Sequence, residues 1–277
     1  MLRNTFCHTP GISARKEGLL WSSGIESWDD VAAAGSLPVS AKLRGALALR
    51  VAESIEHLER RDPRYFASTL KPNQHWRLFP DFRHSIAYLD IETTGTGYGD
   101  TITTIALYDG EAIHHYVKDH NLESFKYDIR RYSLLVTYNG KCFDAPVIAN
   151  YFGAPLRQPH IDLRHVLKSL GYAGGLKACE RQLGIHRGAL ADVDGYFAVL
   201  LWRDYVRNRN LAALETLLAY NIQDAVNLEA LLILAYNMKL RETPFRRELA
   251  IEMPAAPRLP FVANETTIAR IRRAYRR

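Results

Sequence analysis

Two acidic residues separated by one position stand at the end of an apolar run, in the stretch YLDIETTG of residues 88–95. In a β-strand, residues i and i+2 point to the same face, so Asp90 and Glu92 would present two carboxylates side by side. Burying unpaired carboxylates is costly, and their repulsion raises the pKa of one of them unless a cation lies between them. Carboxylate oxygens suit Mg²⁺ or Mn²⁺. The pair therefore predicts a divalent metal site, the alternative being that the strand ends at Leu89 and the acids are solvated.

Two later segments contain acidic residues that could contribute to the same site. Asp144, in YNGKCFDAP, follows a strand-like run at a predicted helix start, where helix capping is its alternative role. In LLAYNIQDAVNL, Tyr220 and Asp224 stand four residues apart, which places a phenol and a carboxylate on one face of a predicted helix. The alternative for this pair is an amphipathic helix with a partly exposed tyrosine and a solvated acid.

The elements that must position these side chains follow from the spacing of apolar residues. Residues 1–80 are predicted to be helical, with Ser40 as the N-cap of one helix. From about residue 84 four strand-like runs follow, HSIAYLDIE, TITTIALYDG, EAIHHYVKD and YSLLVTYNG, with turn residues between them. After Gly140 the patterns are helical, including HIDLRHVLKSLG (160–171), in which Asp162 is a candidate N-cap.

This order of elements predicts an α/β fold, with a mixed sheet flanked by helices. We expect a small N-terminal helical domain in residues 1–80, the sheet domain in residues 81–240 and a basic C-terminal tail in residues 241–277. Asp192 and Asp194, in ADVDG, precede a predicted helix and are expected to cap it.

Three of these motifs, taken in order, resemble a known class of enzymes. DIETTG, YNGKCFD and YNIQD are similar to the three exonuclease motifs of the DEDD class, which has a ribonuclease H-like fold. The tyrosine four residues before the last aspartate is typical of the DEDDy subgroup, to which the proofreading domains of family B DNA polymerases belong. The closer resemblance is to the YprB-like predicted exonucleases, which are similar in PGI…E…LW…GI…W, in WRLFPDFR and in DGYFAVLLW. The similarity covers about residues 6–236.

The resemblance implies a metal-dependent 3′→5′ exonuclease that acts on single-stranded DNA or RNA ends and releases nucleoside 5′-monophosphates. Two Mg²⁺ or Mn²⁺ ions would be held by four carboxylates, and no small-molecule cofactor is expected. Asp90 would bridge both ions, Glu92 and Asp224 would hold the ion beside the attacking water, and Asp144 would hold the other ion through water. Tyr220 would orient the attacking water, because a phenol with a pKa near 10 is a poor base.

Five further residues are candidates for contact with the substrate. The residues after the two acids, Thr93, Thr94 and Gly95, would face the terminal nucleotide through backbone groups. Asn139 and Phe143 would line the substrate channel, with Phe143 stacking on a base. For each of the five, a role in a turn or in core packing is the alternative.

The front segment PGISARKEGLLWSSGI resembles a helix-hairpin-helix element, in which a glycine turn offers backbone N–H groups to a phosphate. Gly11 and Ile12 would form the turn, and Arg15 and Lys16 would add positive charge. Ser13 stands where a second glycine is usual, which makes the approach to nucleic acid less close. The alternative is a purely structural helical cap.

Composition and charge narrow the setting. The net charge is +6, and from Lys239 to the end ten Lys and Arg stand against four Glu, which is also +6. Such a tail contacts phosphates or is a solvated, frayed end. The chain shows no apolar run of about 18 residues and no secretion signal, so no membrane partner is expected. Three scattered cysteines and a histidine pattern without ligand spacing favour a cytoplasmic protein without a disulfide framework or a histidine metal site.

Three rival functions follow from the same residues. The first is a non-catalytic nucleic-acid-binding module on a ribonuclease H-like fold. The second is a phosphatase of the haloacid dehalogenase type, in which a second aspartate, rather than Glu92, would follow the first. The third is a scaffold whose acids are incidental. No residue pattern distinguishes DNA from RNA as the substrate.

Overall fold

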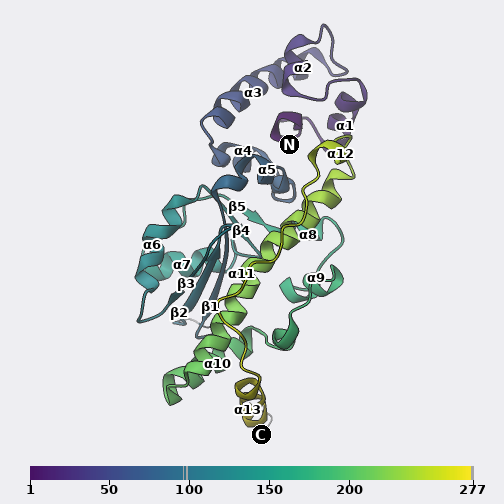
Figure 1. The fold of residues 1–277 in the computed structure, drawn as a ribbon. Coiled ribbons are helices and arrows are strands. Elements are labelled where there is room, and N and C mark those ends of the chain that lie inside the picture. Colours follow the sequence, from purple (N-terminus) through teal and green to yellow (C-terminus); the bar gives the residue numbers. More distant parts are fainter. Residues whose placement is uncertain (96, 98, 276–277) are drawn as a thin grey trace.

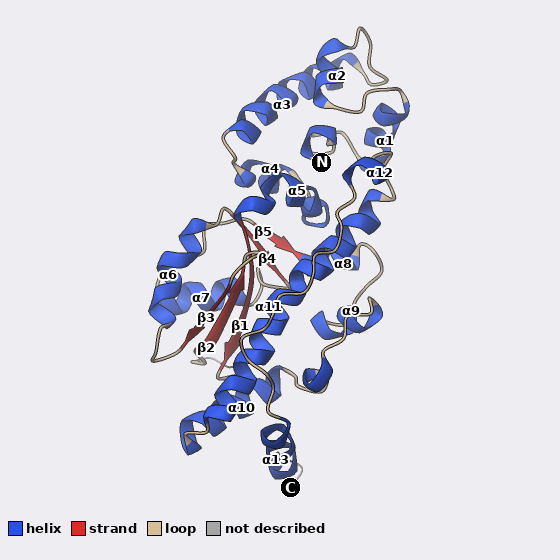
Figure 2. Ribbon diagram, in the orientation of Figure 1, coloured by secondary structure: helices blue, strands red, loops and turns tan. Residues whose placement is uncertain are grey.

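A five-stranded mixed sheet lies in the middle of the molecule, with helices on both of its faces (Figures 1 and 2). The computed structural model describes residues 1–95, 97 and 99–275. The strand order is β3-β2-β1-β4-β5. The strands are β1 (Ile86–Thr93), β2 (Ile102–Tyr108), β3 (Ile113–Val117), β4 (Leu134–Thr137) and β5 (His160–Asp162). The antiparallel meander β1-β2-β3 arises from the first three strand-like runs and β4 from the fourth, and the predicted mixed sheet flanked by helices is confirmed.

The parallel half of the sheet corrects one prediction. β4 pairs in parallel with β1, and β5 pairs in parallel with β4, with Ile161 opposite Val136. The start of HIDLRHVLKSLG was predicted to be helical, but its first three residues form β5 and the helix begins at Leu163. A segment of three residues is too short to show an alternation of buried and exposed side chains, so only its pairing with β4 identifies it as a strand. Asp162 nevertheless caps the helix, as predicted, by accepting from the Arg164 N–H.

The two faces of the sheet have different apolar layers. On one face, residues of β1 such as Leu89 pack with α6 (Phe125–Asp128), η5 (Ile129–Arg131) and α7 (Asp144–Phe152). The opposite face packs against α10 (Gly195–Asn208) and the 30-residue α11 (Leu211–Leu240). The remaining central helices are η4 (Leu122–Ser124), α8 (Leu163–Lys168), α9 (Leu176–Gln182) and η6 (Gly188–Leu190). Asp194 caps α10, as predicted, whereas Asp192 pairs with Arg272 instead.

The long helix α11 is the central support of the fold. Its length and composition would suit a membrane span, but 72% of its most apolar window is buried inside the protein, as in the core helix of a globular fold. Figure 1 shows α11 running diagonally across the sheet from α10 to the N-terminal helices. The middle of α11, which carries Asp224, lies against β1.

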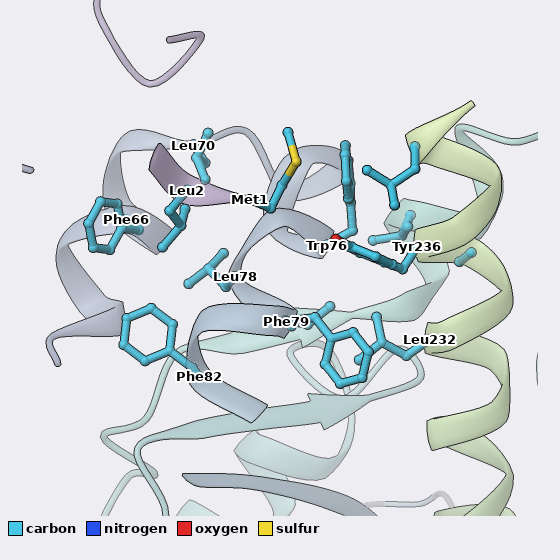
Figure 3. Close-up of a cluster of buried hydrophobic side chains, with 14 of the residues drawn as sticks. Met1, Leu2, Phe66, Leu70, Trp76, Leu78, Phe79, Phe82, Leu232 and Tyr236 are labelled. Carbon is cyan, nitrogen blue, oxygen red and sulfur yellow. The ribbon is translucent and has the colours of Figure 1, made fainter. Parts of the chain in front are cut away.

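The N-terminal region is helical and shares a hydrophobic cluster with α11. Its elements are η1 (Leu2–Asn4), α1 (Ala14–Ser22), α2 (Trp28–Ala33), α3 (Ala41–Glu59), α4 (Pro63–Thr69), η2 (Pro72–Leu78), α5 (Phe79–Phe82) and η3 (Arg83–Ser85). Ser40 caps α3, as predicted. Figure 3 shows Trp76 and Phe79 facing Leu232 and Tyr236 of α11, all buried.

The C-terminal residues return along the length of α11. After α12 (Arg246–Leu249), an extended segment runs beside α11 to α13 (Glu265–Tyr275) (Figure 1). Hydrogen bonds secure both ends of this segment to α11, between Asn237 and Ile251 and from the Asn264 N–H to Thr216 Oγ1. The amphipathic α13 buries Ile268 and Ile271 in the cluster with α10.

Candidate active site

Two strand residues and one helix residue bring their carboxylates together. Asp90 and Glu92 lie on the face of β1 that α11 covers, and Asp224 reaches them from the middle of α11. One oxygen of each of the three lies within 4.8 Å of the others. Glu92 and Asp224 are 8% and 4% exposed, so their charges are largely removed from water.

Asn221 fixes the relation between the strand and the helix. Its side-chain amide donates a 2.7 Å hydrogen bond to Asp90 Oδ2, and the residue is completely buried. Tyr220 and Asp224 stand one helical turn apart on the same buried face, because residues i and i+4 are neighbours on an α-helix. Sequence reasoning did not single out Asn221. The signal was present in YNIQD, where two polar residues, Asn221 and Gln223, lie between the tyrosine and the aspartate in a mainly apolar helix.

Asp144 occupies the first position of α7, as predicted, and is 5% exposed. It is not one of the three residues whose oxygens lie within 4.8 Å of one another. It is still close enough to the site for the Asp90 carboxylate, together with burial, to raise its pKa well above the ordinary value. Phe143, just before it, packs partly buried against the cluster beneath the sheet.

Burial and mutual repulsion disfavour the ionised forms of Asp90 and Glu92. Burial raises the pKa of Asp90 to about 7, although the hydrogen bond from Asn221 and the charge of Arg187 act in the opposite direction. Burial and the charge of Asp90 raise the pKa of Glu92 well above its ordinary value. A shared divalent cation removes this repulsion, and an all-carboxylate donor set of this kind fits a hard, oxygen-binding metal.

Two cations that lie against the Tyr220 ring complete the electrostatics of the site. Lys177 Nζ lies 4.4 Å from the centre of the Tyr220 ring, and the Arg187 guanidinium lies 5.4 Å from it. Arg187 forms ion pairs with Asp224 and, at 2.7 Å, with Glu180, which is completely buried. Burial and the charge of Arg187 lower the pKa of Lys177 to about 8.

Sequence reasoning did not single out this cationic pair, which comes from the segment LKACERQLGIHR of residues 176–187. Glu180 is held by Arg187 and by a 2.8 Å hydrogen bond from Asn227 of α11. The partners lie 7 and 47 residues away. No local pattern indicates such a network. The acidic and basic residues in an otherwise apolar segment were the available signal.

The residues that follow the two acids form the turn between β1 and β2. The hydroxyl of Thr93 donates to the Gly95 carbonyl at 2.5 Å, and that of Thr94 donates to Asp100 at 2.7 Å. A Cβ atom on Gly95 would lie 2.6 Å from the Asp100 carboxylate, so a larger residue would displace that side chain. Thr93, Thr94 and Gly95 thus lie next to the carboxylates, with both hydroxyls used inside the turn.

Asn139 lies at the end of β4 in a left-handed conformation, with φ at +63°. Its N–H donates to Asp162, and its side-chain oxygen accepts a 2.6 Å bond from Arg164. A Cβ atom on Gly140 would lie 2.4 Å from Thr137, so only glycine fits this turn. Asn139 and Arg164 line a pocket with Tyr138, Lys168 and Tyr172, at the carboxyl ends of β4 and β5.

The N-terminal candidates lie apart from the carboxylates, in the helical region that Figure 1 shows at the opposite end from α10. Gly11 has φ at +88°, and Ile12 is buried in the hydrophobic cluster. Arg15 is exposed, and the Lys16 ammonium donates to the Gly11 carbonyl at 2.9 Å. The turn thus exists, and one of its carbonyls is occupied by the neighbouring lysine.

Comparison with known proteins gives one family and one structural relative. A family model described as the RNase_H superfamily matches residues 87–236, more than half of the chain. The structure of the family B DNA polymerase from the hyperthermophilic archaeon Pyrobaculum calidifontis is similar at a TM-score of 0.42 and 15% sequence identity. That similarity covers 60% of this chain and 27% of the polymerase, so the chain spans about a quarter of its length. No curated protein matches the sequence.

Proposed function

Because the chain belongs to the RNase H superfamily, we propose that it is a metal-dependent 3′→5′ exonuclease acting on single-stranded nucleic acid. The observation that carries the proposal is the convergence of Asp90, Glu92 and Asp224 within 4.8 Å in a largely buried site. Such a site is costly to maintain without a cation. The RNase H superfamily fold supports nuclease activity on nucleic acid in general. The exonuclease type and the 3′ end are the further steps that we propose, from the resemblance of the three motifs.

The roles of the acidic residues follow from their positions. Asp90, Glu92 and Asp224 would hold divalent ions, Mg²⁺ or Mn²⁺, with Asp144 as the fourth carboxylate. When bound, the ions supply Lewis-acid polarisation of the phosphodiester and make water more acidic. Asn221 would keep the Asp90 carboxylate in one orientation.

Tyr220 would act as a hydrogen-bond donor. Burial and the charges of Glu92 and Asp90 raise the pKa of its phenol, so the hydroxyl stays protonated at neutral pH. A protonated phenol orients a water molecule but does not remove a proton from it. Lys177 and Arg187, which lie against the Tyr220 ring, would offset the negative charge of a phosphate group.

The direct test is digestion of single-stranded DNA and RNA of equal sequence, each labelled at its 5′ end. Mn²⁺, Mg²⁺ or a chelator is added, with Asp224→Asn as the inactive variant and the exposed Asp29→Asn as the matched control. We expect a metal-dependent ladder of shortened 5′-labelled products, absent in Asp224→Asn only. Immediate release of a labelled mononucleotide would instead show attack from the 5′ end. Binding without any cleavage would support the alternative, a non-catalytic nucleic-acid-binding module.

A further inference from the structure

A pocket lined by five arginines lies on a different part of the molecule from the carboxylates. One wall is the turn between α3 and α4, and the other is formed by residues near the end of η5 and by the loop after α7. The arginines are Arg60, Arg61, Arg64, Arg130 and Arg157. They come from three separate segments of the chain. The concentration of charge is therefore produced by folding and is not a run of basic residues in the sequence.

The positive charge of this pocket is largely uncompensated. Asp62 is the one acid among the lining residues, which leaves five positive charges against one negative. Both Asp62 oxygens are engaged, one by the Arg64 N–H and the other by His57, each at 3.0 Å. Arg60 lies 3.6 Å from Glu56. In the described part of the chain, no carboxylate lies within 4.0 Å of the other four guanidinium groups.

The backbone beneath the pocket is held firmly to the sheet. The Ser133 N–H donates to the Ser85 carbonyl at 2.9 Å, and the two hydroxyls are 2.6 Å apart. The Gln158 side chain donates to the Ile129 carbonyl at 2.8 Å, which joins the loop after α7 to η5. Like charges on flexible loops can move apart, whereas these walls keep the guanidinium groups around one concave surface. An anionic ligand would relieve their repulsion.

We propose that this five-arginine pocket binds the phosphate backbone of a nucleic acid, at a second contact point remote from the carboxylates. The inference rests on the proposed function, because it supplies a binding site for the part of the substrate that is not being cleaved. A guanidinium forms paired hydrogen bonds with phosphate oxygens, and all five basic residues in the pocket are arginines.

The position of the pocket predicts a dependence on substrate length. Ser85 stands just before β1, and Asp90 and Glu92 are five and seven residues further along the chain. At about 3.3 Å per residue, the pocket floor is roughly 17–23 Å from the carboxylates. A strand stacked as in a helix, with phosphates about 3.4 Å apart along its axis, would bridge this distance with about five to seven nucleotides, and a more extended strand with fewer. A dinucleotide in the active site would not reach the arginines in either conformation.

The test is equilibrium binding of a fluorescein-labelled 20-nucleotide single strand, as DNA and as RNA, in chelator over a range of salt concentrations. The variant is Arg64→Gln/Arg157→Gln, and the matched control is Arg246→Gln/Arg247→Gln, exposed arginines of α12. Loss of two phosphate contacts should reduce the salt slope of log K by about 1.4 and weaken binding about tenfold at low salt. With Mn²⁺, the pocket variant should cleave the 20-mer less efficiently at low substrate concentration but should cleave a dinucleotide normally.

Several results would overturn the inference. These are an unchanged salt slope, an equal loss in the α12 control, or equal impairment on the dinucleotide. Binding of a polyglutamate peptide without binding of either oligonucleotide would also reject it in favour of an acidic protein partner. Arginine-dependent binding without any hydrolysis would support the pocket and reject the exonuclease. Hydrolysis combined with binding that does not depend on these arginines would support the exonuclease and reject the pocket. A thermal melt equal to that of the unmodified protein shows that the exposed substitutions leave the fold intact.

Discussion

The side chain of Asn221 donates a 2.7 Å hydrogen bond to Asp90, and this bond joins α11 to β1 at the centre of the candidate active site. Asn221 lies next to Tyr220 and three residues before Asp224, so the same turn of helix carries all three contacts. The alignment of the helix on the strand therefore sets the distance between the carboxylates. Three predictions follow from this arrangement, and a fourth concerns the N-terminal helices.

Removing the Asn221 amide should weaken metal binding without removing any of the four carboxylates. In Asn221→Ala, Asp90 loses the bond that orients it, and we expect Mn²⁺ affinity to fall by at least about tenfold, as is typical for partners of metal ligands. Isothermal titration calorimetry measures this directly. Asn237→Ala is the matched control, because Asn237 is on the same helix but bonds to Ile251 instead. Equal Mn²⁺ affinity in both variants would show that the bond does not position Asp90.

Neutralising one buried acid should stabilise the metal-free protein. Burial and the charge of Asp90 raise the pKa of Glu92, so its ionised form disfavours the folded state. A raised carboxyl pKa contributes stability at pH below the ordinary value, and that contribution is lost as pH rises. In chelator, Glu92→Gln should increase the free energy of unfolding by at least about 1 kcal/mol at pH 8, and by less at pH 5.

Added Mn²⁺ should then raise the melting temperature of the unmodified protein but not that of Glu92→Gln. Glu111→Gln, at an exposed position, is the control that should retain the stabilisation by metal. If chelator-treated Glu92→Gln is no more stable than the unmodified protein at pH 8, the electrostatic cost that we assign to this site is wrong.

Loss of the Tyr220 hydroxyl should slow hydrolysis while leaving metal affinity intact. Tyr220→Phe keeps the ring against Lys177 and Arg187 and removes only the group proposed to orient water, so we expect kcat to fall by about 10²-fold or more. The matched control is Tyr236→Phe, a buried tyrosine on the same helix that packs against Trp76. Single-turnover rates on the 5′-labelled strand provide the measurement, and equal rates in both variants would exclude the role given to Tyr220.

Acid should destabilise the N-terminal helices through His8. Burial lowers the pKa of His8 to about 3, and its Nε2 lies 2.8 Å from Ser54 Oγ. A lowered histidine pKa means that the folded state prefers the neutral ring. The stability that it contributes is complete above the ordinary pKa of 6.5 and is lost as pH falls toward 3.

His8→Gln should therefore have a shallower pH dependence of unfolding free energy between pH 6 and 4, by up to about 1.4 kcal/mol per pH unit. Urea titrations at several pH values measure the slope. His186→Gln, at an exposed position, should keep the slope of the unmodified protein. A common slope for all three proteins would mean that His8 is not protonated on unfolding in this range.

Much of the fold was predictable because its signals are local. The short apolar runs of β1 and β2, which are buried on both faces, and the helical spacing of α3 and α11 lie within single segments, where such patterns are directly readable. The caps at Ser40, Asp162 and Asp194 were predictable for the same reason, since each bonds to a backbone N–H two or three residues away. β5 was not, because its three residues are a strand only beside β4.

The candidate site was likewise predictable only where its signals are local. The sequence by itself determined the residue types and the spacing of Asp90 with Glu92 and of Tyr220 with Asp224, because two positions along a strand and four along a helix fix a shared face. It also predicted a cation for these acids, on the condition that they are buried.

Only the tertiary structure decided which distant groups complete these sites. Asn221 reaches Asp90 across 131 residues, and Asn227 holds Glu180 across 47. The five arginines of the pocket likewise come from three segments. Such pairings depend on how α11 and the loops pack against the sheet. That packing is set by apolar surfaces spread over the whole chain, and no short pattern of charged residues encodes it.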